Sequence, residues 1–446
     1  MTSSDSFCDA TLLETSTCRS DSPTITDSSS VLGDDTADRI TLFPPYARIA
    51  NDGSGDWVLR VTGWLWRTSG KSKRSQFLAG LAKRLVLLGS PSCEASNALF
   101  SDRSAGFFAQ LLSNIVVRIA IIGPSTAPTG LAMPNGSQAS LLSDTEVASL
   151  DTNSLQTHTD SYVWDDATTD ASGRFCLSTR ISKSSIDRIN SSSQDIPLRQ
   201  GVPDPTALLL LAYLPDKQLE SRAAATVKLI HPTGVSVISD IDDTIKDSSV
   251  FLGKHTAIKV ALMEDHKEIV GMADCYNLLN GRLIRIYKSS QQASKGVAFH
   301  YLSAAPFQLS LSISSFLHSF SFPLGSVTLR TVAEALSTRK YKVAELTRIF
   351  EEFPKQQFVL IGDSGEKDID IYYDIDKAYE SRVLKVFIRN VTGDTSKLPD
   401  LYKRVDCLYG KPHNTDKWKF FINPTDIILD ELLMSVISQT PSTLNI

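Results

Sequence analysis

The first part of the chain carries apolar segments of strand length separated by polar turns. Residues 41–50 and 57–66 are rich in aromatic and β-branched side chains, and the sequence Asn-Asp-Gly-Ser-Gly at 51–55 favours a turn between them. Similar segments follow at 115–122, 174–179, 207–213 and 224–230. Because no regular helical pattern separates these segments, they predict an antiparallel β-sandwich.

The second part of the chain alternates between strand and helix patterns. Apolar segments that predict strands lie at 235–240, 298–303, 326–331, 357–362 and 382–388. Helical patterns between them include 306–318 and 342–353. This alternation is typical of an α/β fold, with helices on both faces of a parallel sheet.

Residues 246–297 are too long for a simple connection between the first two of these strands. We expect them to form a small helical cap, with helices marked by 260–263 and 269–279. The pattern changes at His231-Pro232-Thr233-Gly234, which favours a turn and marks a junction.

These patterns divide the chain into three regions. Residues 1–38 are rich in Ser, Thr and Asp with almost no aromatic side chains, so we expect a disordered tail. Residues 39–232 form the β-rich domain, in which a polar stretch at 123–172 predicts a mobile surface insertion. Residues 233–446 form the α/β domain, and a chain of 446 residues is long enough for both.

A basic segment of the β-rich region has two interpretations. The apolar side chains of Phe77, Leu78, Leu81 and Leu85 fall on one face of a helix predicted at 76–88, which either covers the sandwich core or lies on an anionic membrane. We favour the first, because most amphipathic helices face a protein core. The basic residues in and before this helix are Lys71, Lys73, Arg74, Lys83 and Arg84.

Composition restricts the class of protein. An apolar content of 42% and a charged content of 21% are those of a soluble globular protein, and a net charge of −5 argues against nucleic acid as the main partner. The six cysteines form no CxxC pair, so we expect reduced thiols in the cytoplasm. No secretory signal is visible, and no segment reaches the roughly 18 apolar residues of a spanning helix. We expect a cytoplasmic protein that is at most peripheral to membranes.

The sequence Ser-Asp-Ile-Asp-Asp-Thr-Ile-Lys at 239–246 directly follows a predicted buried strand. Ligands of open α/β sheets bind at the carboxyl ends of strands, and crowded carboxylates are unfavourable unless a cation or a proton transfer uses them. Here Asp240 could attack an electrophile, Asp242 could transfer protons, and the hydroxyl of Thr244 could hold the loop. This spacing favours phosphoryl transfer.

Three further clusters follow strands in the same part of the chain. Ser303 ends one strand just before a helix begins at Pro306, and Arg339-Lys340-Tyr341-Lys342 begins the helix after the next strand. Asp363 and Asp368 follow a fourth strand. A phosphate dianion repels a carboxylate nucleophile, so a divalent cation is needed, and oxygen-only ligands suit Mg²⁺.

The segments 239–246, 301–309 and 358–368 resemble the haloacid dehalogenase superfamily and, more narrowly, the actin-patch-type phosphatidate phosphatase family. The sequences at 43–49 and 61–65 extend this resemblance into the β-rich region. The resemblance implies a haloacid-dehalogenase-like sheet with a small cap. It also implies a Mg²⁺-dependent enzyme that hydrolyses phosphatidate to diacylglycerol and phosphate. Its implied partners are phosphatidate in membranes, met transiently, and proteins of actin patches or endocytic sites.

The resemblance also implies roles for individual residues. Asp240 resembles the nucleophile that forms an aspartyl-phosphate, and Asp242 the general acid and base. Thr244 matches the position that steadies the loop, and Ser303 the donor to a phosphate oxygen. Lys342 matches the lysine that screens the nucleophile and the phosphate.

Lys340 is a rival for the role of Lys342, because it lies two residues away. The implied Mg²⁺ ligands are Asp240, the backbone carbonyl of Asp242, Asp363 and Asp368. Asp243 and Glu366 are typical of the narrow family but receive no role.

Two other functions stay open. The first is a phosphatase with the same chemistry that acts on a soluble phosphomonoester or a phosphoprotein. The second is an interaction scaffold at cortical actin or endocytic sites with weak catalysis, although the intact set of acids, serine and lysine argues against an idle site. Only the narrow resemblance favours a lipid over a soluble substrate.

Overall fold

The computed structural model describes residues 38–68, 80, 83, 93–126, 163–191, 203–217, 221–289, 297–331, 334, 337–412 and 416–430. These residues belong to one compact unit, Asp35–Ile446. The predicted disordered tail lies outside the described residues except for Asp38, and the predicted basic helix lies outside them except for Gly80 and Lys83.

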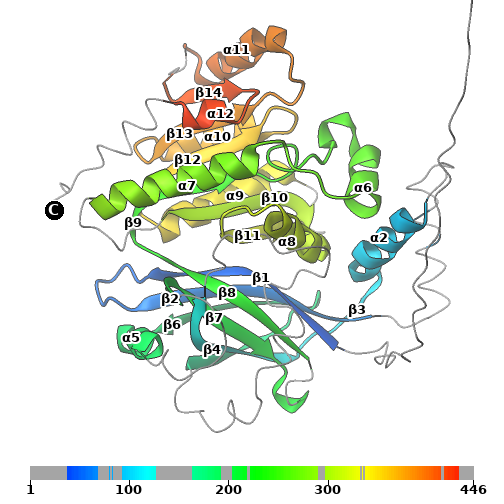
Figure 1. Ribbon diagram of the computed structural model, residues 1–446, viewed down its shortest axis with the longest axis vertical. Coiled ribbons are helices and arrows are strands. Elements are labelled where there is room, and N and C mark those ends of the chain that lie inside the picture. The colour runs from blue at the N-terminus through cyan, green and yellow to red at the C-terminus, as the bar shows by residue number, and fades with distance from the viewer. Residues whose placement is uncertain are drawn as a thin grey trace, which may run out of the picture. The chain divides into compact units, whose positions relative to one another are not determined.

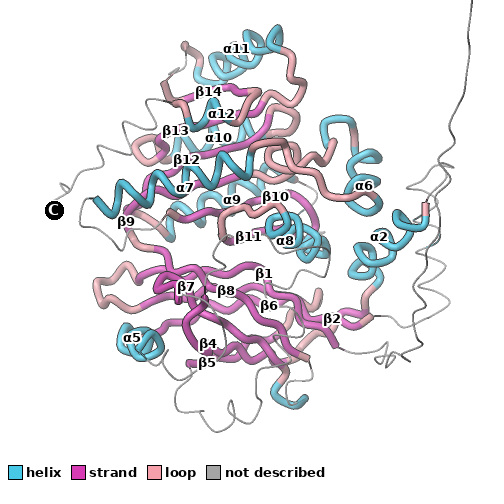
Figure 2. The backbone as a smooth tube through the Cα atoms, in the orientation of Figure 1, coloured by secondary structure: helices cyan, strands magenta, loops and turns pink. Residues whose placement is uncertain are grey.

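The β-rich region forms one hydrogen-bonded sheet with the strand order β3-β2-β1-β8-β7-β4-β5, in which β6 pairs with β2. Its pairs are antiparallel except for the parallel pair of β1 and β8. Figure 2 shows this region as long strands joined by turns. The strands are β1 (Asp38–Ile49), β2 (Trp57–Arg67), β3 (Gln110–Leu111), β4 (Val116–Thr126), β5 (Val163–Thr168), β6 (Arg174–Ile181), β7 (Pro203–Tyr213) and β8 (Arg222–Ile230).

Side chains from distant strands of this sheet share one apolar core. Leu59 of β2 and Phe175 of β6 belong to the same buried cluster as Ile119 of β4 and Leu208 of β7. Because β2 and β4 are far apart in the strand order, the sheet must fold back on itself to bring them together. The prediction of an antiparallel β-rich region with sandwich-like packing is confirmed.

The predicted insertion at 123–172 is wrong at both ends. Strand β4 continues to Thr126, and β5 occupies 163–168, while residues 127–162 lie outside the described part. In β5, Asp165 and Asp166 are exposed and Ala167 is buried. An edge strand with one solvated face contains polar residues, so its sequence looked like a loop.

The second sheet has the order β11-β10-β9-β12-β13-β14, and each neighbouring pair is parallel. The parallel α/β sheet is therefore confirmed, while the short β14 was not predicted. Its strands are β9 (Thr233–Ser239), β10 (Ala298–Pro306), β11 (Ser326–Arg330), β12 (Lys355–Asp363), β13 (Val383–Arg389) and β14 (Trp418–Phe421).

Helices cover both faces of the second sheet, as predicted (Figure 1). Val237 of β9 packs in one apolar cluster and the next residue, Ile238, in another, because successive side chains of a strand point to opposite faces. The first cluster includes side chains of α7, α8 and α12, and the second those of α9, α10 and α11. These helices are α7 (Met272–Ser289), α8 (Ser310–Ser319), α9 (Thr338–Glu352), α10 (Asp368–Ala378), α11 (Leu398–Tyr409) and α12 (Thr425–Ile428).

Other short elements complete the described chain. The expected helical cap contains η5 (Val250–Leu252) and α6 (Lys254–Met263). The cap helix expected at 269–279 is wrong, because these residues form the start of α7, whose buried side chains pack against one face of the second sheet. None of the described helices combines the length and apolar character needed to cross a membrane. The β-rich region also contains α2 (Glu94–Ser104), η1 (Ala105–Phe108), α5 (Lys183–Ser191) and η4 (Pro215–Lys217). The α/β region also contains η6 (Phe307–Leu309) and η8 (Thr395–Lys397).

The chain passes from the first sheet to the second between Ile230, the end of β8, and Thr233, the start of β9, near the predicted junction. Buried contacts join them: the ring of Phe307 in η6 meets Trp64 of β2 edge-on, with 5.1 Å between ring centroids. Because both sheets lie in one compact unit, the division into separate domains stays a prediction.

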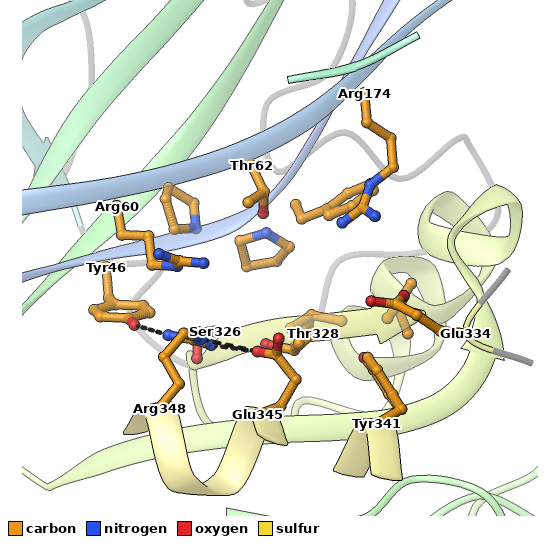
Figure 3. A pocket seen from close by; sticks show the side chains of 15 residues that line it. Tyr46, Arg60, Thr62, Arg174, Ser326, Thr328, Glu334, Tyr341, Glu345 and Arg348 are labelled. Atoms are coloured by element: carbon orange, nitrogen blue, oxygen red, sulfur yellow. Dashed lines mark hydrogen bonds and ion pairs between the residues drawn. The ribbon is translucent and has the colours of Figure 1, made fainter. Parts of the chain in front are cut away.

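A polar network also links the first sheet to helix α9. The hydroxyl of Tyr46 in β1 accepts a hydrogen bond of 2.6 Å from Nη1 of Arg348 (Figure 3). The same hydroxyl donates to the Glu352 carboxylate. Arg348 also donates to Glu345 and Glu352. Tyr46 itself is buried, so its hydroxyl depends on these partners.

We expect Tyr46→Phe to lower the free energy of unfolding by about 1–3 kcal/mol, because it leaves the partly buried charges of Arg348 and Glu352 without one partner. Urea denaturation measures this change. Tyr373→Phe is the control, since the Tyr373 hydroxyl lies 3.5 Å from the Nζ of the exposed Lys377 and should contribute less than about 0.5 kcal/mol. Equal losses in the two variants would contradict a special role for the network.

Candidate active site

Asp240 directly follows β9, and its backbone still pairs with the neighbouring strand, because its N–H donates to the carbonyl of Ile361 at 2.9 Å. Its side chain is buried. Oδ2 accepts a hydrogen bond of 3.0 Å from the hydroxyl of Thr244, and Oδ1 accepts one of 2.6 Å from Nζ of Lys342. The structure therefore brings three of the predicted site residues together at the carboxyl end of the central strand.

The two candidate lysines occupy very different environments. Lys342 is 1% exposed, and its Nζ donates to Oδ1 of Asp368 at 2.7 Å as well as to Asp240. Lys340 is exposed, although its backbone N–H donates to the capping side chain of Ser337 at the start of α9. Residues two apart on a helix point in different directions, so only one of the two can face the acids. The geometry favours Lys342.

The acidic side chains form a compact cluster. Oxygens of Asp240, Asp363 and Asp368 all lie within 4.8 Å of one another, and all three residues are buried. Oδ1 of Asp363 accepts from the backbone N–H groups of Gly365 at 2.6 Å and Glu366 at 3.0 Å. Oδ2 of Asp363 is buried and has no hydrogen-bond partner among the residues that the structure describes.

Burial and mutual repulsion disfavour the ionised acids. Burial raises the pKa of Asp240 well above its ordinary value, and the carboxylates of Asp368 and Asp363 add to this while Lys342 opposes it. Burial likewise raises the pKa of Asp363, with a further contribution from Asp368. Burial by itself would lower the pKa of Lys342, but Asp240 and Asp368 together raise it well above its ordinary value.

The cluster fits a divalent cation. Once ionised, the three aspartates outnumber the ammonium of Lys342, and Glu366 adds a carboxylate 3.7 Å from it. The unpartnered Oδ2 of Asp363 is available as a ligand. An all-oxygen donor set suits a hard cation such as Mg²⁺.

Asp242 and Ser303 meet in an arrangement that the sequence did not predict. The hydroxyl of Ser303 donates to Oδ2 of Asp242 at 2.7 Å and accepts from the backbone N–H of Ala305 at 2.9 Å. The hydroxyl of Ser248 donates to Oδ1 of Asp242, also at 2.7 Å. The predicted contact of Ser303 with a phosphate oxygen and the predicted metal contact of the Asp242 carbonyl stay predictions.

Asp243 organises the loop that follows β9. Its carboxylate accepts from the backbone N–H groups of Ser248 and Phe251, each at 3.0 Å, and its carbonyl accepts from Arg389 at 2.6 Å. Asp243 has a φ of 56°, in the left-handed region. Sequence reasoning noted Asp243 without a role and missed Ser248 and Arg389. The only sequence feature that could have indicated their roles is position: Asp243 lies within the acidic sequence at 239–246, and Ser248 lies two residues after it.

A separate pocket lies between the first sheet and helix α9 (Figure 3). None of the predicted catalytic residues lines it. Among its arginines, Arg348 pairs with Glu345 at 2.7 Å, and Arg60 lies 3.7 Å from Glu352. Because this pocket holds none of the predicted catalytic residues, the buried acidic cluster is the better candidate for the active site.

Comparisons with known proteins agree with this choice. Residues 235–390 match the family model described as "Phosphatidate phosphatase APP1, catalytic domain". This range contains the acidic sequence, Ser303, Lys342 and the acids after β12. The resemblance expected from the sequence is thus confirmed for this part of the chain.

Two curated relatives are fungal proteins. The chain is 27% identical over 198 residues to "Uncharacterized protein C29B5.04c" of Schizosaccharomyces pombe, covering 42% of this chain and 30% of the relative. It is 26% identical over 176 residues to "Phosphatidate phosphatase APP1" of Saccharomyces cerevisiae, covering 38% of this chain and 28% of the relative. The chain therefore spans less than a third of the length of these relatives. Among solved structures, it is similar to a haloacid dehalogenase-like hydrolase from Burkholderia xenovorans, with 12% identity and a TM-score of 0.24, covering 44% of this chain and 99% of that one.

We expect Lys342→Met to lower the free energy of unfolding by about 3 kcal/mol, because it leaves buried carboxylates without their ammonium. Lys340→Met should change it by less than about 0.5 kcal/mol, since Lys340 is exposed. Urea denaturation without added divalent cation compares the two. A larger loss in Lys340→Met would transfer the role to that residue.

Proposed function

We propose that this chain is a Mg²⁺-dependent phosphatase that hydrolyses phosphatidate to diacylglycerol and phosphate, because residues 235–390 match the model of a phosphatidate phosphatase catalytic domain. The family match supports a phosphatase. The observation that carries the chemistry is the buried carboxylate of Asp240, which contacts Lys342 and Thr244 and lies within the acidic cluster.

The proposed reaction has two transfers. In the first, an oxygen of Asp240 attacks phosphorus, the bond from phosphorus to the diacylglycerol oxygen breaks, and Asp242 gives that oxygen a proton. In the second, Asp242 takes a proton from water, the water oxygen attacks phosphorus, and the bond to Asp240 breaks. Phosphate leaves, and both aspartates return to their starting states.

Other side chains hold the reacting groups. Thr244 donates to Oδ2 of Asp240 and keeps the carboxylate turned toward the site. The Lys342 ammonium would offset the negative charge that gathers on the nucleophile and the phosphate. The Ser303 hydroxyl, which donates to Asp242 here, would turn toward a phosphate oxygen when substrate binds.

Mg²⁺ would be held by Asp240, Asp363, Asp368 and the backbone carbonyl of Asp242. When bound, the ion supplies charge neutralisation, so that a carboxylate can approach a phosphate dianion. The chain's own contribution is to fix these oxygens: the backbone N–H groups of Gly365 and Glu366 orient Asp363, and Lys342 orients Asp368.

The cellular setting is part of the proposal. A phosphatidate substrate lies in a membrane, so the protein would act from the cytoplasm as a peripheral enzyme. Association with cortical actin patches or endocytic proteins rests on the family resemblance alone.

Asp240→Asn and Asp242→Asn should each lower phosphate release by roughly a thousandfold or more, because an amide can neither attack as an anion nor transfer the proton. Both variants should keep the circular dichroism spectrum of the native protein. Asp247→Asn in the same loop is the control, and its rate of phosphate release should stay within about twofold of the native protein. Near-native turnover by Asp240→Asn would exclude the aspartyl-phosphate mechanism.

The substrate is tested by comparing phosphate release from phosphatidate vesicles and from soluble phosphomonoesters at equal phosphate concentration. A phosphatidate phosphatase should show a kcat/KM at least about tenfold higher on vesicles, because the remainder of a preferred substrate contributes binding energy to the transition state. A preference for soluble esters or for a phosphopeptide would favour the alternative phosphatases. No turnover of any of them would favour the scaffold.

Metal binding can be measured without turnover. Mg²⁺ should raise the thermal unfolding temperature of the native protein, because a ligand that binds only the folded state stabilises it. Asp363→Ala should remove this shift, whereas Asp374→Ala, which changes an acid paired with Arg339 on the surface, should retain it. A shift of equal size in Asp363→Ala would contradict the assigned metal site.

A further inference from the structure

The carboxylate of Asp242 is held from both sides by serine hydroxyls. Ser248 donates to Oδ1 and Ser303 donates to Oδ2, each at 2.7 Å. The two serines come from different elements, because Ser303 lies in β10 and Ser248 follows the acidic loop. The general acid of the proposed reaction thus has two oxygens in different environments.

A buried lysine fixes the direction of the Ser248 hydroxyl. Nζ of Lys246 donates to Oγ of Ser248 at 3.1 Å, and an ammonium group has no lone pair with which to accept. The Ser248 oxygen must therefore accept from Lys246, which leaves the hydroxyl proton for Asp242. Lys246 and Ser248 are 5% and 4% exposed, so water competes little for these bonds.

The backbone around Ser248 is also anchored. Its N–H donates to Oδ1 of Asp243 at 3.0 Å, and Oδ2 of the same carboxylate accepts from Phe251. The carbonyl of Asp243 is in turn held by Arg389. The hydroxyl of Ser248 therefore rests on a backbone that is fixed on both sides, as a group that orients a catalytic acid requires.

We propose that Ser248, oriented by Lys246, is a positioning residue that holds Oδ1 of Asp242 while Oδ2 transfers the proton. This inference rests on the proposed function. When a phosphate enters, the hydroxyl of Ser303 turns toward a phosphate oxygen and releases Oδ2. Ser248 then keeps the carboxyl group in place with Oδ2 directed at the leaving oxygen.

Ser248 takes no direct part in the proton transfer of the first step. The phosphorus–oxygen bond of the substrate breaks with its electron pair on the leaving oxygen, and the proton on Oδ2 of Asp242 moves to that oxygen to form an alcohol. Asp242 becomes a carboxylate with Oδ1 still bonded to Ser248. Ser248 neither gives nor takes a proton, so it acts only through the orientation of Asp242.

This role predicts a dependence on the leaving group. A diacylglycerol alkoxide is a poor leaving group and needs the proton, whereas p-nitrophenolate leaves without one. Ser248→Ala should lower kcat/KM for short-chain dioctanoyl phosphatidate by roughly 10–100-fold, as expected when a catalytic group loses its orientation. The value for p-nitrophenyl phosphate should stay within about threefold of the native protein. kcat/KM is the right quantity because it reports the first phosphoryl transfer.

Two further variants complete the experiment. Ser249→Ala is the matched control, because the neighbouring Ser249 hydroxyl contacts Asp247 at 3.3 Å and not Asp242. It should leave the ratio of the two kcat/KM values unchanged. Ser248→Cys keeps the size of the side chain but is a weak donor, so it should reproduce the selective loss even if Ser248→Ala folds poorly.

The outcomes separate the inference from the proposed function. If the native protein hydrolyses neither ester, the proposed function fails, and the inference fails with it. If the native protein hydrolyses both and the Ser248 variants lower both equally, or neither, Ser248 does not position Asp242. A selective loss on dioctanoyl phosphatidate supports the inference.

Discussion

The ammonium of Lys342 joins acidic groups that the second sheet brings together from different elements. Asp240 follows β9 and Asp368 begins α10, and the carboxylates of both accept hydrogen bonds from the same buried nitrogen. Without that cation, burial and mutual repulsion would favour protonated acids, which can neither attack nor bind a metal. The position of α9 is therefore set by charge as well as by apolar packing.

Helix α9 consequently serves two parts of the molecule. Its first turns carry Lys342 into the acidic cluster, and its last turns carry Arg348 and Glu352 to Tyr46 of the first sheet. Apolar contacts run in parallel, because Phe43 and Trp64 pack against Phe307 at the start of the segment that leads into α8. The β-rich region thus supports elements that border the candidate active site.

The sequence predicted those features that depend on short stretches of chain. Asp240, Asp242 and Thr244 follow a strongly apolar strand, and the parallel sheet then requires that Asp363 end at the same edge. Helical geometry, once known, distinguishes Lys342 from Lys340, but the sequence offers both at the start of one helix. What decides between them is burial, which depends on the whole fold.

Other features could not be predicted because they depend on distant contacts or unusual backbone. Strand β5 has a solvated face, and β14 has only the residues Trp418–Phe421, so neither shows a clear period. The partnership of Ser248 with Asp242 requires a loop in which Asp243 and Ser249 both have positive φ, at 56° and 53°. Such conformations are uncommon for residues other than glycine, and nothing in the residue types announces them.

The contacts of Phe307 affect whether residues 235–390 could be stable without the β-rich region. Residues 235–390, which carry the family match, contain one side of an interface whose other side is Phe43, Tyr46 and Trp64. Cut out alone, this fragment would expose Phe307 and leave Arg348 without its tyrosine, and it would lose β14 from the edge of its sheet. A buried aromatic surface laid open in this way promotes aggregation. Residues 235–390 therefore depend on the β-rich region for a stable fold, and the proposed phosphatase chemistry would need both parts of the chain.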